Sequence, residues 1–266
     1  MRIETFSFLV DPEAGFRVDV HDQAATCVSV VLDRPDKLNC QSPAMWLELI
    51  RLQRSLPGTT RVMLLRAEGR AFSAGLDRAL FTNDDPDGMR ALPRLPQEEA
   101  TARIGLWQQA FDWSSRPALV SIAAVQGHAV GAGFQLALGA DIRIAADDVQ
   151  FCMAEPTLGI VPDLGGTKRL VELTGCSRAT EICLTGRRVG AEEALRIGLV
   201  SHVVPRAELD AAAQRTADAV LAVDQDAAAE TKALLAAAST RSQHEQEQAE
   251  REAQYRRLRA MAGLDD

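Results

Sequence analysis

Aromatic residues and patterned cysteines are both scarce in this chain. Phe, Trp and Tyr make up 5% of its 266 residues, and Tyr255 is the single tyrosine. This scarcity argues against platforms on which nucleobases or sugars stack. The five cysteines are odd in number and too widely spaced for CxxC or zinc-binding motifs, so we expect reduced thiols in a cytoplasmic protein.

The chain also lacks an excess of positive charge and any long apolar run. It has 29 Lys and Arg residues against 37 Asp and Glu residues, a formal net charge of −8. This balance argues against a general binder of nucleic acids or anionic membranes, because no global field attracts phosphate groups. No signal peptide is recognisable, and no apolar run approaches the roughly 18 residues that span a bilayer. We therefore expect a soluble protein with no nucleic-acid or membrane partner.

Strand and helix signals alternate over most of the chain. Short β-branched or fully apolar runs predict strands, and Ser42-Pro43 supplies the serine N-cap and first-turn proline that open a helix. Further helices are expected at 97–114, after a loop at 82–96, and at 134–138. This recurrence predicts an α/β core. The expected strands are 6–10, 16–20, 25–32, 62–65, 118–125, 141–145 and 149–153.

The composition changes near residue 204. Strand signals vanish there, and the remainder is rich in Ala, Glu, Gln and Arg, which predicts helices only. We expect a core at 1–204 and a helical region at 205–266. The segment 245–260 has only Tyr255 and Leu258 as large apolar residues. Such a helix packs through few side chains or through another subunit.

Two turns of small residues follow buried strands. They are Phe72-Ser73-Ala74-Gly75-Leu76-Asp77 and the segment 126–133, QGHAVGAG. A turn from a strand into a helix leaves backbone N–H groups without acceptors, and small side chains let a ligand approach them. Two such groups can form an oxyanion hole, or the glycines can serve tight strand–helix packing alone. Neither turn matches GxGxxG or GxxxxGK[ST], so a nucleotide site is disfavoured.

Several spaced motifs occur in order along the chain. They are LDRPDKLN at 32–39, RAFSAGLD at 70–77, AVQGHAVGAG at 124–133, GADIR at 139–143, PDLGGT at 162–167, TGRRV at 185–189, AEEA at 191–194 and GLV at 198–200. Together they resemble the enoyl-CoA hydratase/isomerase (crotonase) superfamily. The resemblance implies an α/β spiral of ββα repeats with a helical C-terminal trimerisation region. It also implies a homotrimer or dimer of trimers, an acyl-CoA substrate, no separate cofactor and no metal.

The resemblance further implies the residues of an active site. The backbone N–H groups of Leu76 and Ala132 bind the thioester oxygen and stabilise the charge that develops on it. Glu155 takes the place of one of the two glutamates that hydratases of this family use. Gln135 takes the place of the other, and an amide has no titratable proton near neutrality, although it can orient a water. Standard two-glutamate hydration is therefore not expected.

Asp163 is a second candidate acid. It occupies a position used by an active-site aspartate in dienoyl-CoA isomerases and by the nucleophile of aryl-CoA dehalogenases. Its alternative role is a helix N-cap ahead of Leu164-Gly165-Gly166, and the alternative for Glu155 is a solvated loop carboxylate. A single glutamate also suffices in Δ3-Δ2 enoyl-CoA isomerases, where one carboxylate takes a proton and returns it two carbons along.

The resemblance assigns the CoA portion of the substrate to Arg34, Lys37, Ala74 and Asp77. A local cation suits an acidic protein that binds a polyanion, although Arg34 and Lys37 can equally be ordinary solvated charges.

Two further sets of side chains are weaker candidates. The last helix carries Arg256, Arg257 and Arg259, which could reach the CoA of a neighbouring subunit or simply form a solvated face. His128 is expected to pack or hydrogen-bond rather than to act in catalysis.

Three hypotheses about function remain open. The favoured one is an isomerase or atypical hydratase of enoyl-CoA that uses Glu155 as acid and base. The second is a dehalogenase-like or hydrolytic enzyme with Asp163 as nucleophile. The third is a non-catalytic protein that binds acyl-CoA and lost the first glutamate at Gln135.

Overall fold

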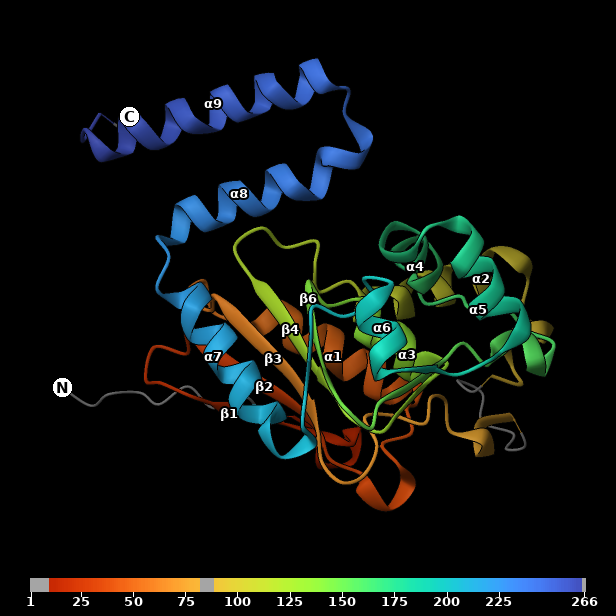
Figure 1. Cartoon of the computed structure of the whole chain (residues 1–266). Coiled ribbons are helices and arrows are strands. Elements are labelled where there is room, and N and C mark those ends of the chain that lie inside the picture. Colours follow the sequence, from red (N-terminus) through yellow and green to blue (C-terminus); the bar gives the residue numbers. More distant parts are fainter. Residues whose placement is uncertain (1–9, 82–88, 265–266) are drawn as a thin grey trace.

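The central sheet of the protein has six strands in the order β1-β2-β3-β4-β6-β9. We describe residues 10–81 and 89–264 of a computed structural model (Figure 1). β1 and β2 are antiparallel and the other neighbours are parallel. These strands are β1 (Phe16–Val20), β2 (Cys27–Leu32), β3 (Val62–Ala67), β4 (Val120–Val125), β6 (Ile142–Ala146) and β9 (His202–Val204).

A second sheet joins three short strands, β5 (His128–Val130), β7 (Gln150–Cys152) and β8 (Val189–Gly190). β5 lies within the segment 127–133 that the sequence predicts as a turn, so this part of the prediction is wrong. Gly127, at φ +54°, turns the chain, and the next three residues extend and pair with β7 in parallel. β5 leads directly to Gly131 and to helix α3 (Ala132–Leu138).

The central sheet is buried on both faces. Successive side chains of a strand point to opposite sides, so Leu64 of β3 packs in one apolar cluster and Leu65 in another. The first cluster includes α7 (Leu209–Leu221), which lies across the sheet in Figure 1, and the second includes α1 (Pro43–Ser55). Burial on both faces accounts for the unbroken apolar run at 62–65.

Most predicted elements lie where the sequence places them. Ser42 accepts a hydrogen bond from the Met45 N–H and caps α1, whose first residue is Pro43. The helix predicted at 97–114 is shorter, because α2 ends at Gln108 and continues only as a 3-10 turn, Gln109–Phe111. Residues 6–9 and 82–88 of the predicted strand and loop lie outside the described residues. The remaining helices are α2 (Gln97–Gln108), α4 (Gly166–Thr174), α5 (Cys176–Thr185), α6 (Ala191–Arg196), α8 (Gln225–Ala237) and α9 (Gln243–Met261).

The described chain after residue 204 is helical, as predicted. α7 packs on the sheet, whereas α8 and α9 form an antiparallel pair that extends away from the core (Figure 1). α8 has no fully buried residue and α9 has only Ala253. The division into a core at 1–204 and a region at 205–266 stays a prediction.

Lys232 fastens α8 to the segments that lead into β4 and β6. Its ammonium donates to the carbonyl oxygens of Arg116, at 3.0 Å, and of Leu119, and it pairs with the carboxylate of Asp141 at 2.8 Å. Asp141 also accepts bonds from the backbone N–H and the hydroxyl of Ser121. The Lys232 and Asp141 side chains are only 13% and 19% exposed. This pair is therefore a largely desolvated anchor for the helical pair α8–α9.

Lys232→Met tests the anchor. It leaves the Asp141 carboxylate without its counter-ion, and breaking a buried pair from one side costs about 3 kcal/mol of unfolding free energy. Urea denaturation measures the loss. Lys168→Met is the control, because Lys168 pairs with Glu172 at the surface and such pairs contribute less than about 1 kcal/mol. Equal losses in the two variants would contradict the anchor.

Candidate active site

The two predicted turns lie against each other. The Ser73 N–H donates to the His128 carbonyl at 2.9 Å, and the Val130 N–H donates to the Ser73 carbonyl at 3.0 Å. Gly75 has φ +87°, and a Cβ there would lie 2.5 Å from the Val130 oxygen. A Cβ at Gly133 would lie 2.5 Å from the Ser73 oxygen. No side chain fits at either position. The glycines therefore serve tight packing, and the same packing brings the two turns together.

Leu76 and Ala132 present backbone N–H groups beside this contact. Ala132 is the first residue of α3, so its N–H has no acceptor within the helix. Neither N–H donates a hydrogen bond to another of the described residues. Both residues line one cavity, with a volume of about 90 Å³. The geometry thus places the two candidate donors of the oxyanion hole at a common space.

Two carboxyl groups, Glu155 and Asp163, line the same cavity. Glu155 begins the 3-10 turn Glu155–Leu158 after β7, and Asp163 lies in the loop before α4. The sequence analysis did not identify the apolar lining, since its residues come from separate elements; the lining includes Trp46, Met89, Trp107, Val130, Leu158, Ile160 and Leu164.

Burial in this cavity disfavours the charged form of either acid. It raises the pKa of Glu155, although the residue's own backbone N–H and then the hydrogen bond from Gln135 act in the opposite direction, and the charge of Asp163 raises the pKa further. Burial likewise raises the pKa of Asp163. Both groups are therefore more readily protonated than exposed carboxyls.

The Glu155 carboxyl has one bound oxygen and one free oxygen. Oε1 accepts a hydrogen bond from Gln135 Nε2 at 2.7 Å, whereas Oε2 is buried and has no partner among the described residues. Glu155 is 7% exposed, so the alternative of a solvated loop carboxylate is wrong. Gly131 makes room for it, because a Cβ at that position would lie 3.2 Å from Oε1.

Gln135 lies behind Glu155 and does not line this cavity. Its Oε1 accepts hydrogen bonds from the backbone N–H groups of Leu164, at 2.9 Å, and Gly166, at 3.2 Å. It lines a neighbouring cavity of about 380 Å³ instead. The amide is thus bonded to protein groups at both ends, and the structure gives no support to a role in orienting water beside the substrate.

Asp163 is not the N-cap of a helix, which corrects the alternative interpretation of its role. α4 begins at Gly166, and its N-cap is Gly165. The Asp163 carbonyl accepts a hydrogen bond from the Gln108 side chain at 2.7 Å, which ties the loop to α2. The Asp163 carboxyl remains available to the cavity.

The candidate CoA-binding residues are divided between two places. Ala74 lines the cavity of Glu155. Asp77 does not, because its carboxylate accepts bonds from the Ala79 N–H at 3.0 Å and from the Cys40 thiol at 3.4 Å. The Ala79 bond chiefly lowers the pKa of Asp77. Asp77 therefore stabilises its own turn.

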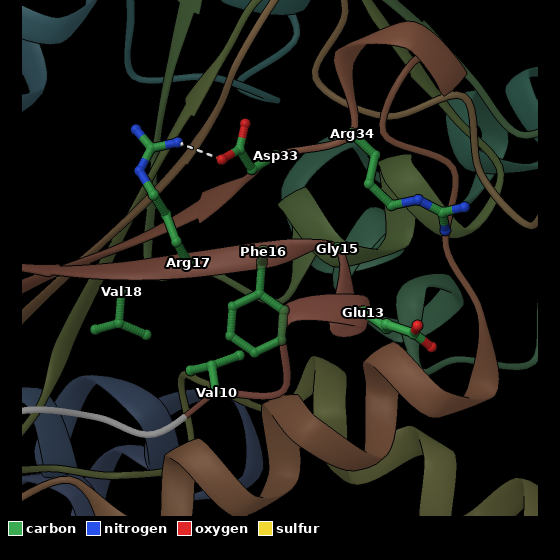
Figure 2. A pocket seen from close by; sticks show the side chains of 8 residues that line it. All are labelled: Val10, Glu13, Gly15, Phe16, Arg17, Val18, Asp33 and Arg34. Atoms are coloured by element: carbon green, nitrogen blue, oxygen red, sulfur yellow. Dashed lines mark ion pairs between the residues drawn. The ribbon is translucent and has the colours of Figure 1, made fainter.

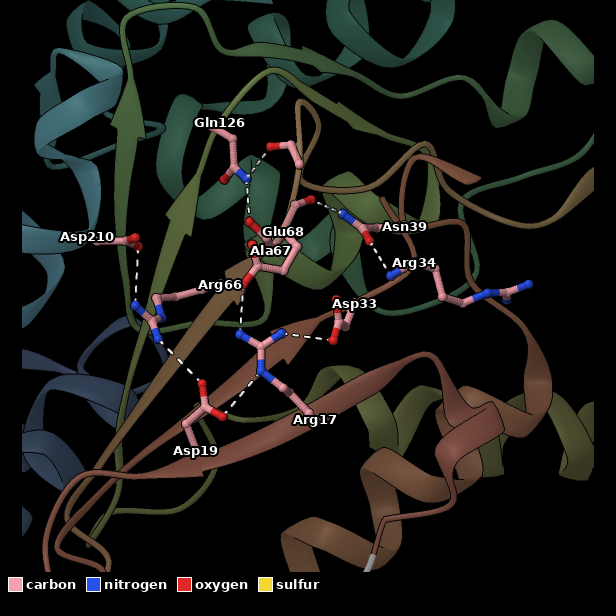
Figure 3. A network of polar contacts seen from close by, with 11 residues as sticks. Arg17, Asp19, Asp33, Arg34, Asn39, Arg66, Ala67, Glu68, Gln126 and Asp210 are labelled. Atoms are coloured by element: carbon pink, nitrogen blue, oxygen red, sulfur yellow. Dashed lines mark hydrogen bonds and ion pairs between the residues drawn. The ribbon is translucent and has the colours of Figure 1, made fainter. Parts of the chain in front are cut away.

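Arg34 and Lys37 lie on a loop that is bonded to the first turn. The Ala74 N–H donates to the Leu38 carbonyl at 2.8 Å. Asn39 accepts a bond from the Arg34 N–H and donates to the carbonyls of Glu68 and Ala71, part of the network in Figure 3. This network ties the loop that carries Arg34 and Lys37 to the first turn.

The Arg34 side chain lines a separate polar cavity of about 660 Å³, drawn in Figure 2. Glu13, Arg17 and Asp33 line it too, and Arg17 pairs with Asp33 at 2.9 Å. Lys37 is exposed. Neither cation lines the cavity of Glu155 and Asp163.

The arginines of α9 pair within the chain. Arg256 binds Glu230 of α8 at 2.8 Å, and Arg257 binds Asp224 at 3.1 Å. Arg259 lies further along the same helix. At least the first two arginines therefore join α9 to the preceding segment.

A catalytic role for His128 and a metal site have no support in the described part of the chain. His128 is exposed, lies outside the cavity and is 3.0 Å from an Arg188 nitrogen, which confirms hydrogen bonding as its role. Residues 10–81 and 89–264 contain no group of three or more His, Cys, Asp and Glu side chains that could hold a metal. Over the same ranges, no helix is long and apolar enough to cross a membrane.

The fold and this cavity define an α/β protein with two main-chain donors close to a buried carboxyl. The family model for enoyl-CoA hydratase/isomerase matches residues 22–261. The chain belongs to this family, as its motifs predicted.

Solved structures confirm the crotonase-type fold. The chain is similar to a protein of Thermobifida fusca YX, assigned as an enoyl-CoA hydratase, in complex with CoA, with 42% identity, a TM-score of 0.87 and coverage of 94% of this chain and 95% of that one. The same protein in complex with acetoacetyl-CoA gives 41% identity and a TM-score of 0.86, over 92% and 95% of the two chains.

Curated relatives match over shorter segments. A probable enoyl-CoA hydratase of Rhodobacter capsulatus is 36% identical over 181 residues, 68% of this chain and 66% of that protein. The carnitinyl-CoA dehydratase of Escherichia coli K12 is 53% identical over 88 residues, 33% of this chain and 34% of that protein. The chain thus spans just under two thirds of the first relative and about one third of the second.

The environment of Glu155 predicts a stability effect that is independent of activity. Because folding raises the pKa of this carboxyl, stability is lost as the pH rises from the ordinary glutamate range through the folded-state pKa. We expect Glu155→Gln to be more stable than the wild type at about pH 8, by on the order of 1 kcal/mol, and the gain to shrink at acidic pH. Thermal unfolding at several pH values measures it. Glu192→Gln is the exposed control, and a pH-independent difference at position 155 would contradict this account.

Proposed function

We propose that this protein is an acyl-CoA enzyme that isomerises the double bond of an enoyl-CoA, with Glu155 as acid and base. One observation carries the proposal: Glu155, whose buried Oε2 has no partner among the described residues, lines the same cavity as Leu76 and Ala132. A base and two donors at one cavity are what removal of a proton next to a thioester requires.

The proposed reaction depends on negative charge that develops on the thioester oxygen. Glu155 takes a proton from the α-carbon of a 3-enoyl thioester, and the electron pair of the broken C–H bond moves toward the thioester oxygen. Hydrogen bonds from Leu76 and Ala132 stabilise this developing enolate, a contribution of several kcal/mol in comparable sites. The protonated Glu155 then delivers the proton to the γ-carbon, which gives the conjugated 2-enoyl product. The neutral amide of Gln135 takes no part in proton transfer.

The apolar surroundings of Glu155 suit this role. A general acid and base works best when its pKa lies near the working pH, and burial raises the pKa of Glu155 toward that range. The same carboxyl can then accept and release a proton within one turnover.

Hydration is the second candidate function. The names of the relatives favour it, and Asp163 offers a second carboxyl in the same cavity. The charge of Asp163 raises the pKa of Glu155, so one carboxyl can hold a proton while the other is ionised. In this case Glu155 and Asp163, rather than two glutamates, would share the acid and base steps.

Isomerisation of a 3-enoyl-CoA tests the main proposal. We expect the wild type to form the conjugated thioester and Glu155→Gln to lose at least about 10²-fold in kcat, because the amide cannot accept the proton. Absorbance of the conjugated product measures the rate, and Glu192→Gln is the matched control. Unchanged turnover in Glu155→Gln would contradict the proposal.

Two other outcomes identify the remaining hypotheses. Single-turnover reaction in H2(18)O that labels the Asp163 carboxyl would instead support a hydrolytic or dehalogenase-like enzyme. Tight binding of CoA esters without turnover of any ester would support a binding protein, and Gln135→Glu would then be examined for gain of hydration.

We also propose that the protein is a cytoplasmic homotrimer, or a dimer of trimers, that needs no separate cofactor. Five free cysteines support the location. The assembly is supported by α8 and α9, whose apolar side chains are left uncovered: Leu235, Tyr255, Leu258 and Met261 are 52 to 81% exposed. Large exposed apolar side chains on one helical pair are typical of an interface.

Sedimentation velocity tests the assembly. We expect a trimer or hexamer for the wild type and dissociation when charge is placed on α9 in Tyr255→Glu/Leu258→Glu. Leu184→Glu on α5 is the control, since Leu184 is also exposed, at 71%, but lies outside the helical pair. A monomeric wild type would contradict the proposal.

A further inference from the structure

The orientation of the Gln135 amide is determined by its neighbours. The backbone N–H groups of Leu164 and Gly166 both point at one end of the amide, so that end must be the acceptor oxygen. The other end is therefore the NH2 group, and it faces Glu155 Oε1 at 2.7 Å. Gln135 is 1% exposed, so water does not compete for these bonds.

This orientation makes the two oxygens of Glu155 unequal. Oε1 accepts an N–H, and a carboxyl oxygen that carries the proton is the weaker acceptor of the two. Oε2 has no partner among the described residues. The hydrogen bond from Gln135 therefore favours protonation of Glu155 at Oε2.

We propose that Gln135 is a positioning residue that holds Glu155 through Oε1 and leaves Oε2 as the one oxygen that takes and returns the proton. The inference rests on the proposed function and deepens it. In the first step the α-carbon C–H bond breaks, an O–H bond forms at Oε2, and the electron pair enters the dienolate. In the second step the O–H bond breaks, a C–H bond forms at the γ-carbon, and Glu155 returns to its ionised form.

Gln135 acts through Glu155 and not on the substrate. Gln135 lines the neighbouring cavity of about 380 Å³, together with Leu164, Gly165 and Arg169. Its oxygen also holds the N–H groups that follow Asp163 in the chain. One neutral side chain therefore fixes the base and the loop of the second carboxyl relative to each other.

Gln135→Met removes both the NH2 donor and the oxygen acceptor of the amide, and the new side chain has a similar volume. Without the N–H donor, the ionised form of Glu155 is less stable, so the acidic limb of the kcat/KM profile should move to higher pH. We expect kcat to fall by about tenfold or more while KM changes little, since a hydrogen bond to a charged group is lost away from the substrate. With substrate deuterated at the α-carbon, the share of label transferred to the γ-carbon should fall, because a carboxyl free to rotate exchanges its proton more readily.

Gln135→Glu separates positioning from mere packing. Its oxygen can still accept from Leu164 and Gly166, but the other oxygen donates to Glu155 only when protonated. The pH profile of kcat/KM should therefore change from a single acidic limb to a bell shape. Activity is lost at high pH because both carboxyls are then ionised. An unchanged pH profile in both variants would overturn the inference.

Gln126→Met is the matched control. Gln126 is also a buried glutamine, and its amide bonds the carbonyls of Ala67 and Gly69 in the network of Figure 3, outside the cavity. We expect it to lose stability but to keep the wild-type pH profile. A profile displaced equally by Gln126→Met would show that the effect is general and overturn the positioning role.

A second readout does not require turnover. Infrared difference titration follows the Glu155 carboxyl, identified by its loss in Glu155→Gln, and its midpoint should move to higher pH in Gln135→Met. If the wild type failed to isomerise any enoyl-CoA but this shift were observed, the proposed function would fail while the contact between Gln135 and Glu155 stood. An active wild type with no shift would remove the inference and leave the proposed function intact.

Discussion

The close approach of two backbone segments is the constraint on which the site depends. Residues 73–76 and 130–133 come from different parts of the chain, and Gly75 and Gly133 leave no space for a Cβ between them. The contact brings Leu76 and Ala132, the first residue of α3, to one cavity, and Gly131 makes room for the carboxyl of Glu155. Because the two candidate donors are main-chain groups, their positions follow from the fold itself, and they would bind a ligand with little loss of side-chain entropy.

Glu155 is buried and Asp163 is half-buried, and the fold reduces the cost of this burial without removing it. Two carboxyls in apolar surroundings would repel each other if both were ionised. A neutral amide at position 135 supplies a hydrogen bond to one of them without adding a third charge, and it uses its other end on backbone N–H groups. Gln135 therefore holds Glu155 through Oε1, while Oε2 has no partner among the described residues. Such a local loss of stability is typical of groups that are selected for chemistry and not for stability.

The sequence predicts what lies in short motifs or repeats along an element. The apolar run at 62–65, the cap at Ser42 and the small-residue turns each carry their own signal, and the order of motifs identifies the family. β5 gives no such signal, because three residues between glycines become a strand only through pairing with β7. The bonding of Gln135 is equally hidden, since its partners Leu164 and Gly166 are 29 and 31 residues further on. Long-range contacts of single side chains are not encoded in local pattern.

The two N–H groups bound by Gln135 have a consequence for which residues this chain can carry at that position. The backbone N–H groups of Leu164 and Gly166 need an acceptor from position 135. Glutamate and glutamine both supply one, so exchange between them changes the available protons and preserves the loop. An apolar residue would leave two buried donors unpaired. Position 135 is thus a place where one nucleotide change in a codon can alter the chemistry of the pocket while the architecture around it is inherited unchanged.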